Sequence, residues 1–171
     1  MREEDKMSIS FVRIDDRVLH GQIVTRWSKL KPCKGILIID DIIVNDSFQK
    51  KIFLNSAPAG VKVGIYSVEE GKERIAKAQS VVNGYFVICK TPRTLVNLKK
   101  IGADFGDKVN VGPMSARPNT LTVGRNCSLT DDEILAFQEL SDMGVSVEFQ
   151  LIPDEAPTSW STIKNKIDKL K

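Results

Sequence analysis

One stretch of five apolar residues, 35–39, most constrains how this chain of 171 residues can fold. It reads Gly-Ile-Leu-Ile-Ile and contains no polar residue that would mark a solvent face. A strand of this kind suits a parallel sheet that is covered on both faces. Residues 85–89 form a similar run. Helix-start signals lie between such runs, because Ser67 with Glu70 forms a capping box and residues 130–133 repeat the pattern.

The regular alternation of strand and helix patterns predicts an α/β fold. We expect an open, mainly parallel twisted sheet of about seven strands with helices on both faces. The predicted strands are 8–14, 35–39, 61–66, 85–89, 108–111, 120–123 and 145–152. The predicted helices are 22–30, 45–56, 67–79, 91–102, 131–143 and a terminal helix from 159. The length suits a single domain over residues 8–171, after a disordered lead-in of residues 1–7 in which Met7 is an alternative start.

The composition argues against several classes of function. A net charge of +3 and an aromatic content of 6% give no warrant for nucleic acid as a partner. The three cysteines stand far apart and a single histidine cannot build a His-rich site, so we expect no metal. Scattered cysteines fit a reducing cytoplasm. The chain has no run of 18 consecutive apolar residues, and we expect no signal peptide at its charged start. No Walker-type phosphate loop occurs, so we expect no nucleotide cofactor.

The functional site is expected at the loops that follow the strands, because ligands of open α/β sheets bind beyond the carboxyl ends of the strands. Four such loops carry polar or glycine residues: 15–22, 40–41, 91 and 112–117. The first of them contains the only histidine of the chain, His20. Two arginines and two aspartates precede this histidine within seven residues.

This loop has the parts that a transient phosphohistidine needs. A neutral imidazole such as that of His20 is a competent nucleophile toward phosphorus. Asp15 can hold the ring in one tautomer, and Arg17, with Arg13, can take the charge of the phosphoryl oxygens. Gly21 and Gln22 would begin a helix whose unpaired N–H groups favour an anion. The residues alone leave a plain alternative open, in which this is a salt-bridged turn and the histidine a loop or capping residue.

A family resemblance bears on this choice. The residues 15–22, Asp-Asp-Arg-Val-Leu-His-Gly-Gln, with Arg-Ile before them and Thr-Arg-Trp at 25–27, resemble the active-site signature of one family. These are the IIB components of the mannose/fructose/sorbose family of the bacterial phosphoenolpyruvate-dependent sugar phosphotransferase system. Thr91-Pro92 follows the fourth strand as in that family, and Asn-Val-Gly-Pro-Met at 110–114 is similar to its Asn-Val-Gly-Gly-Met loop. The resemblance covers roughly residues 8–170.

The resemblance implies a phosphoryl relay. The phosphohistidine of a IIA component would pass its phosphoryl group to Nδ1 of His20, and from there it would reach a sugar that enters through the membrane components IIC and IID. The family's sugars are mannose, fructose, sorbose and amino sugars. The resemblance implies that Arg17 stabilises the phosphoryl group and that Asp15 is the carboxylate near the ring. Arg13 matches a second basic position.

The loop after the fifth predicted strand would form a neighbouring wall of the site. Pro113 removes one backbone N–H from it and leaves the other amides, including that of Gly112, for the phosphate. Arg13, Gly21, Gln22 and Gly112 are therefore the expected phosphate-binding residues. The protein would lie in the cytoplasm at the inner face of the plasma membrane, held there by IIC and IID, and a homo-oligomer is compatible with the sequence.

Two other functions are alternatives to the phosphoryl carrier. A receiver-like aspartyl-phosphate module needs an acceptor Asp after the third strand and a Lys after the fifth, whereas these strands end in Tyr66-Ser67 and Gly112-Pro113. A non-catalytic module that binds an anion at the same loop is separated from the carrier by its phosphorylation chemistry. Val18 and Leu19 suit either an apolar rim for IIA or packing under the loop, and Asp16 is taken as structural.

Overall fold

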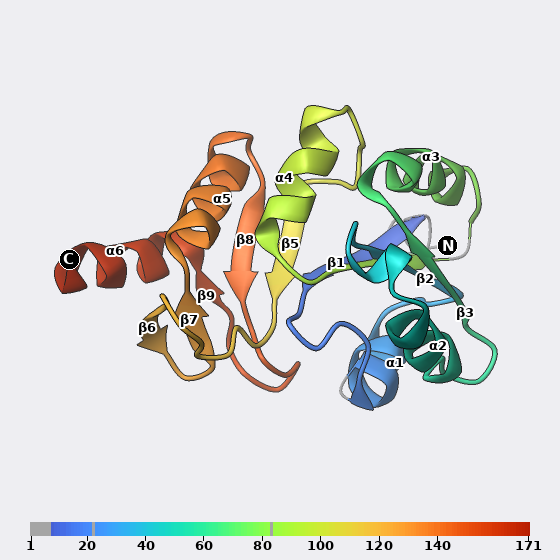
Figure 1. Ribbon diagram of the computed structural model, residues 1–171, viewed down its shortest axis with the longest axis horizontal. Helices are drawn as coiled ribbons and strands as arrows, with labels where there is room; N and C mark the ends of the chain where they lie inside the picture. Colours follow the sequence, from blue (N-terminus) through green and yellow to red (C-terminus); the bar gives the residue numbers. More distant parts are fainter. Residues whose placement is uncertain (1–7, 22, 83) are drawn as a thin grey trace.

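The computed structural model describes residues 8–21, 23–82 and 84–171. A sheet of seven strands in the order β3-β2-β4-β1-β5-β8-β9 forms its centre, and every neighbouring pair is parallel except β8 and β9 (Figure 1). Its strands are β1 (Ile9–Ile14), β2 (Gly35–Ile39), β3 (Lys62–Tyr66), β4 (Tyr85–Cys89), β5 (Lys108–Val111), β8 (Ser146–Phe149) and β9 (Thr158–Ser159). The expected α/β fold with a mainly parallel sheet is therefore confirmed.

Helices cover both faces of this sheet, with α3, α4 and α5 on one face and α1 and α2 on the other (Figure 1). The helical segments are η2 (Ile23–Trp27), α1 (Ser28–Leu30), η3 (Ile43–Asn45), α2 (Ser47–Asn55), α3 (Val68–Gln79), α4 (Pro92–Lys100), α5 (Asp131–Asp142) and α6 (Trp160–Leu170). Both capping boxes are present, at the starts of α3 and α5. They satisfy backbone N–H groups that the first turn leaves unpaired.

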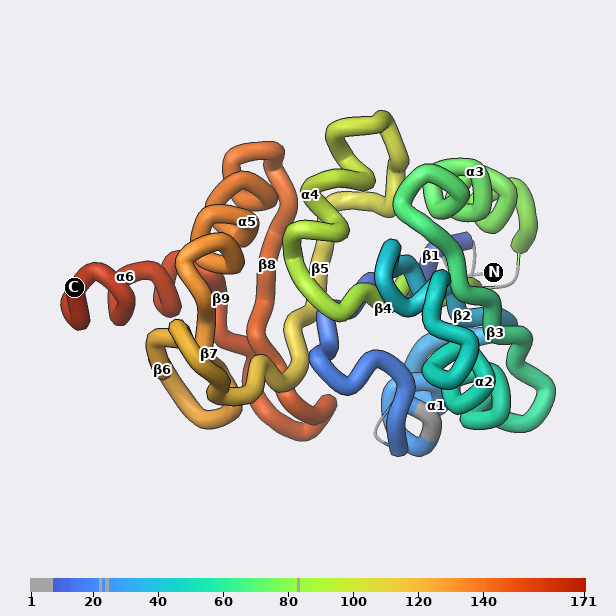
Figure 2. The backbone as a smooth tube through the Cα atoms, viewed as in Figure 1, coloured from blue at the N-terminus to red at the C-terminus, as the bar shows by residue number. Residues whose placement is uncertain are grey.

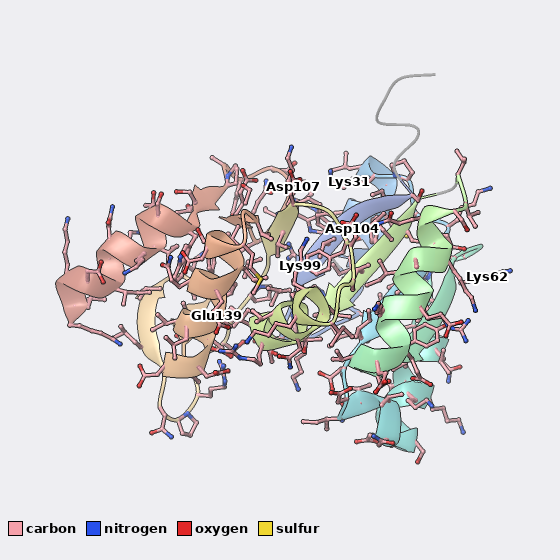
Figure 3. The ribbon with its side chains drawn as sticks, turned by 90° about the horizontal axis from the view of Figure 1, so that it is seen from above. Lys31, Lys62, Lys99, Asp104, Asp107 and Glu139 are labelled. Carbon is pink, nitrogen blue, oxygen red and sulfur yellow. The ribbon has the colours of Figure 1, made fainter. Side chains whose placement is uncertain are left out.

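Successive residues of the central strands pack into two separate hydrophobic cores, because side chains alternate between the two faces of a strand. Ile39 and Val87 belong to the core under α3–α5, whereas Ile38 and Ile88 belong to the core beneath η2 and η3. All five residues of β2 are buried, as the apolar run predicts. The helices of the first face are also joined by ion pairs between α4 and α5, made to Glu139, which Figure 3 labels.

Several elements differ from the sequence prediction. The predicted strand at 120–123 exists as β6 (Leu121–Gly124), but it pairs only with β7 (Cys127–Leu129) in a separate two-stranded sheet. The seventh strand of the main sheet is instead β9, whose second residue was predicted to begin the terminal helix. The predicted helix 22–30 is a π-helix over Ile23–Trp27 with three α-helical residues after it. Gln22 lies outside the described residues, as does the lead-in 1–7.

The strand order places a topological switch point at the end of β1. The chain runs from β1 to β2 and β3 on one side, and from β4 across to β5 and β8 on the other. β1 therefore lies between β4 and β5, and the tube in Figure 2 shows the three strands ending close together. The connections from β1 and β4 leave toward opposite faces of the sheet, which makes this a topological switch point. No helix in the described residues is long and apolar enough to cross a membrane.

Candidate active site

Asp15 is the first residue after β1 and is fully buried. Its backbone N–H continues the sheet ladder by donating to the carbonyl of Cys89, at 2.9 Å. Its Oδ1 accepts the backbone N–H of Arg17 at 3.0 Å, and its Oδ2 accepts from Nε of Arg13 at 3.1 Å. Nε2 of His20 lies 2.8 Å from the same Oδ2. The carboxylate therefore organises the whole loop.

The donor in the contact between His20 and Asp15 can be assigned. The guanidinium of Arg13 and the backbone N–H of Arg17 have no acceptor atom, so each can only donate to Asp15. Both oxygens of Asp15 therefore act as acceptors, as those of an ionised carboxylate do. This arrangement favours the His20 tautomer that carries its proton on Nε2 and donates it to Oδ2. The imidazole side chain is 13% exposed, so it can be reached from solvent while its orientation is held from below.

The segment between Asp15 and His20 is held in an unusual conformation. Val18 has φ 61, in the left-handed region that a β-branched residue rarely adopts. Its side chain is 1% exposed and that of Leu19 is 5% exposed, and both belong to the core beneath the loop. Of the two uses expected for these residues, the structure shows packing under the loop. Such strain persists only where surrounding contacts determine the backbone, and it is common at functional sites.

Arg13 lies behind the site and is also fully buried. Besides Asp15, its guanidinium donates to the carbonyls of Gln150 at 2.9 Å and Leu151 at 3.1 Å, and to the side chain of Asn110. Burial lowers the pKa of the Arg13 guanidinium, and the neighbouring carboxylate of Asp15 opposes this shift. The prediction that Arg13 binds phosphate is not supported by these contacts, because each guanidinium nitrogen already donates to the protein.

Gly112 has a structural part in this arrangement. Its backbone N–H donates to the carbonyl of Ile14 at 2.8 Å, so it is used in the extension of the sheet and does not point to a phosphate. A Cβ atom at this position would lie 2.3 Å from Nη2 of Arg13 and 2.8 Å from Oδ2 of Asp15. The expected phosphate-binding role of Gly112 is therefore replaced by a packing role, because only glycine leaves room for the buried ion pair.

The remaining predicted residues divide between the site and its surroundings. Arg17 and Gly21 are exposed at the mouth of the loop, and the predicted phosphate ligand Gln22 lies outside the described residues. Asp16 joins the loop to the one after β5, because its Oδ2 accepts the backbone N–H of Ser115 at 2.8 Å. Asp40 takes no part in the site, since its Oδ1 accepts two backbone N–H groups, those of Ile42 and Ile43, at the start of η3.

The loop after β8 also borders the site, although the sequence did not predict it there. Residues 150 and 151 of this loop contact Arg13, Asp154 pairs with Arg26 at 2.6 Å, and Glu155 pairs with Arg125. The signal was available, because this loop also follows the carboxyl end of a parallel strand. The predicted strand runs to residue 152 and hides this loop, whereas β8 ends at Phe149. In the described residues, no group of three or more His, Cys, Asp or Glu could hold a metal ion.

A histidine fixed by a buried carboxylate at the switch point of a parallel sheet defines an α/β domain suited to group transfer. Comparison with known proteins shows which family this domain belongs to. The family model for the sorbose-subfamily IIB component of the phosphotransferase system matches residues 9–171, and the chain belongs to this family. Its members are phosphotransfer components of the sugar phosphotransferase system and act as phosphotransferases, so the receiver-like alternative is not favoured.

Individual relatives agree with the family assignment. The fructose-specific EIIB component of Bacillus subtilis is 31% identical over 163 residues, which is 95% of this chain and 99% of that protein. The sorbose-specific EIIB component of Klebsiella pneumoniae is 30% identical over 149 residues, covering 87% of this chain and 90% of the relative. The crystal structure of the IIBSor domain of the sorbose permease from Klebsiella pneumoniae superposes with a TM-score of 0.86 and 28% identity, over 96% of this chain and 99% of that one.

Proposed function

We propose that this protein carries a phosphoryl group on His20, which it receives from the phosphohistidine of a IIA component and passes to a sugar. The observation that carries the proposal is the 2.8 Å contact between Nε2 of His20 and the buried carboxylate of Asp15 at the end of β1. Because Nε2 is engaged in this way, Nδ1 is the ring nitrogen that attacks phosphorus. The family resemblance implies the same atom.

The chemistry follows from this orientation. As the bond between phosphorus and Nδ1 forms, the bond to the donor's ring nitrogen breaks and its electron pair returns to the donor. Positive charge develops on the ring of His20, and the carboxylate of Asp15 stabilises it, as the aspartate of a hydrolase triad stabilises its imidazolium. A sugar hydroxyl then attacks phosphorus and releases its proton to water. The bond between phosphorus and Nδ1 breaks, its electron pair returns to the ring, and the ring of His20 becomes neutral again.

Arg17 is the charge clamp in this proposal. Phosphoryl transfer passes through a loose transition state, so positioning and electrostatic stabilisation of the three oxygens supply most of the catalysis. An exposed guanidinium on the same loop as the histidine can offer two parallel donors to those oxygens. Because a cation and positioned donors meet these demands, we propose that the transfer is metal-free. Gly21 contributes its backbone N–H at the start of the following helical segment.

The partners are proposed from the relatives. The mannose-specific EIIAB component of Escherichia coli matches 99% of this chain at 27% identity, and the match spans 52% of that longer protein. A fusion with a IIA part supports a IIA donor for this chain too. We propose the membrane components IIC and IID as further partners, with a location in the cytoplasm at the inner face of the plasma membrane. Relatives named for fructose, sorbose, mannose and N-acetylgalactosamine indicate the class of sugar.

The test is phosphorylation in a reconstituted relay with IIA and its upstream donors. The wild-type protein should gain one phosphoryl group that is labile in acid and stable in base, and His20→Ala should gain none. Lys62→Ala, at an exposed position at the start of β3, is the control for handling and should be phosphorylated like wild type. If His20→Ala were still phosphorylated, His20 would be excluded as the carrier. The phosphoryl group would then be on a residue other than histidine, because the chain has only this one.

A further inference from the structure

Arg13 joins four parts of the chain behind the site. It extends from β1, contacts Asp15 on the site loop, and donates to Asn110 on β5 and to two carbonyls after β8. Its guanidinium carbon also lies 5.1 Å from the ring centre of Trp27 in η2. The side chain is completely buried, so it cannot touch a partner protein or a sugar.

A buried charge needs strong compensation, because removal from water disfavours the charged form. The structure supplies this compensation from one carboxylate and three neutral acceptors. The carbonyl contacts use the Nη atoms, and the contact with Asp15 uses Nε. The planar guanidinium thus fixes the carboxylate of Asp15 relative to the backbone after β8. A lysine could not reproduce this, because its ammonium group is a single point donor.

We propose that Arg13 is a positioning residue for phosphoryl transfer: it holds the carboxylate of Asp15 in the orientation that keeps the proton of His20 on Nε2 and leaves Nδ1 as the nucleophile. This inference deepens the proposed carrier function and rests on it for the effect on rate. Its structural part, the control of the imidazole tautomer, stands independently of phosphorylation. The role differs from direct phosphate binding, because Arg13 acts only through Asp15.

The tautomer can be measured without ambiguity, because His20 is the only histidine. Nitrogen-15 NMR of the unphosphorylated protein distinguishes the protonated from the unprotonated ring nitrogen. In the wild type, the tautomer with the proton on Nε2 should predominate at pH 8. In Arg13→Met, the carboxylate loses its fixed orientation, and both tautomers should be populated. Arg13→Lys should give an intermediate result.

The transfer rate provides the second measurement. In Arg13→Met the rate of phosphoryl transfer from IIA should fall by about 10²-fold, the scale expected when a reacting group is misplaced by about 1 Å. The KM for IIA should stay within about twofold, because a buried side chain does not contact the donor. Arg93→Met is the matched control: it removes a paired arginine between α4 and α5, and should change neither the tautomer nor the rate.

The outcomes separate the two proposals. A folded Arg13→Met protein with the wild-type tautomer and rate would overturn the positioning role. Should that variant fail to fold, Arg13→Lys decides, because wild-type values in both measurements would show that the planar group is not needed. If His20→Ala is still phosphorylated, the carrier function fails while the tautomer result stands. If phosphorylation depends on His20 but the tautomer is the same in Arg13→Met as in wild type, the positioning role of Arg13 fails and the carrier function stands.

Discussion

Substitution of Gly112 by alanine should damage the site through the buried ion pair. The new Cβ would lie 2.3 Å from Nη2 and 2.6 Å from Cζ of Arg13, and 2.8 Å from Oδ2 of Asp15. Each distance is below any ordinary contact of a Cβ atom. The guanidinium cannot swing aside freely, because it is fully buried and held by Asn110 and two carbonyls.

The size of the effect follows from the two ways of relieving this clash. Overpacking a rigid core costs about 1–3 kcal/mol. Moving Arg13 away would instead separate it from Asp15, and loss of one partner of a buried pair costs about 3–5 kcal/mol. We therefore expect Gly112→Ala to lower the free energy of unfolding by about 3 kcal/mol. For a chain of this length, that corresponds to a fall in Tm of about 6–12 °C.

Thermal unfolding followed by circular dichroism measures the loss of stability, and phosphorylation by IIA measures the loss of function at a temperature where the variant is folded. Gly21→Ala is the matched control within the same site, since its Cβ would meet nothing within 4 Å. That control should change the free energy of unfolding by less than about 0.5 kcal/mol. A Gly112→Ala protein that melts within about 1 °C of wild type and transfers at the wild-type rate would refute the reasoning.

Two further predictions concern charge and thiol chemistry. Arg17→Ala should slow phosphoryl transfer by about 10²–10³-fold without lowering Tm, because the side chain is exposed; unchanged single-turnover kinetics would remove Arg17 from the mechanism. Burial raises the pKa of Cys33 to about 12, raises that of Cys127 to about 11, and also raises the pKa of Cys89. The reactive thiolate is thus disfavoured in the folded protein, so iodoacetamide at pH 8 should label all three cysteines slowly until denaturant restores their ordinary pKa values. Rapid labelling of Cys127 in the folded protein, seen by mass spectrometry, would contradict this.

Helices and strands were predicted well from the sequence where their formation depends on interactions between residues close together in the chain. The capping residues Ser67 and Thr130 satisfy N–H groups three residues away, so the starts of α3 and α5 were predictable. The apolar run over β2 was predictable because burial on both faces leaves no place for a polar side chain. The sheet partner of β6 was not, because residues 121–124 show the same local pattern whether they join the main sheet or a hairpin.

The candidate site also contains some residues whose contacts are local in sequence and others whose contacts depend on the tertiary structure. Asp15, Arg17 and His20 lie within six residues, and their contacts with one another are formed inside one loop. These three residues could therefore be grouped from the sequence. The structure agrees in one respect, because it places the carboxylate of Asp15 next to the imidazole of His20. The place of Arg13 could not be predicted in this way, because its contacts with residues 110, 150 and 151 span 97 to 138 positions of the chain. A strand residue followed by a polar loop can point to a ligand or into the protein, and nothing nearby decides which.

The sequence by itself determined the α/β class, the parallel sheet and the loop that holds the only histidine, because apolar periodicity, capping and residue spacing are local properties. The tertiary structure alone decided that Arg13 is buried behind Asp15 and that Gly112 must lack a side chain to admit it. It also brought the loop after β8 beside the site. These features depend on which strands become neighbours, and that depends on packing across the whole chain.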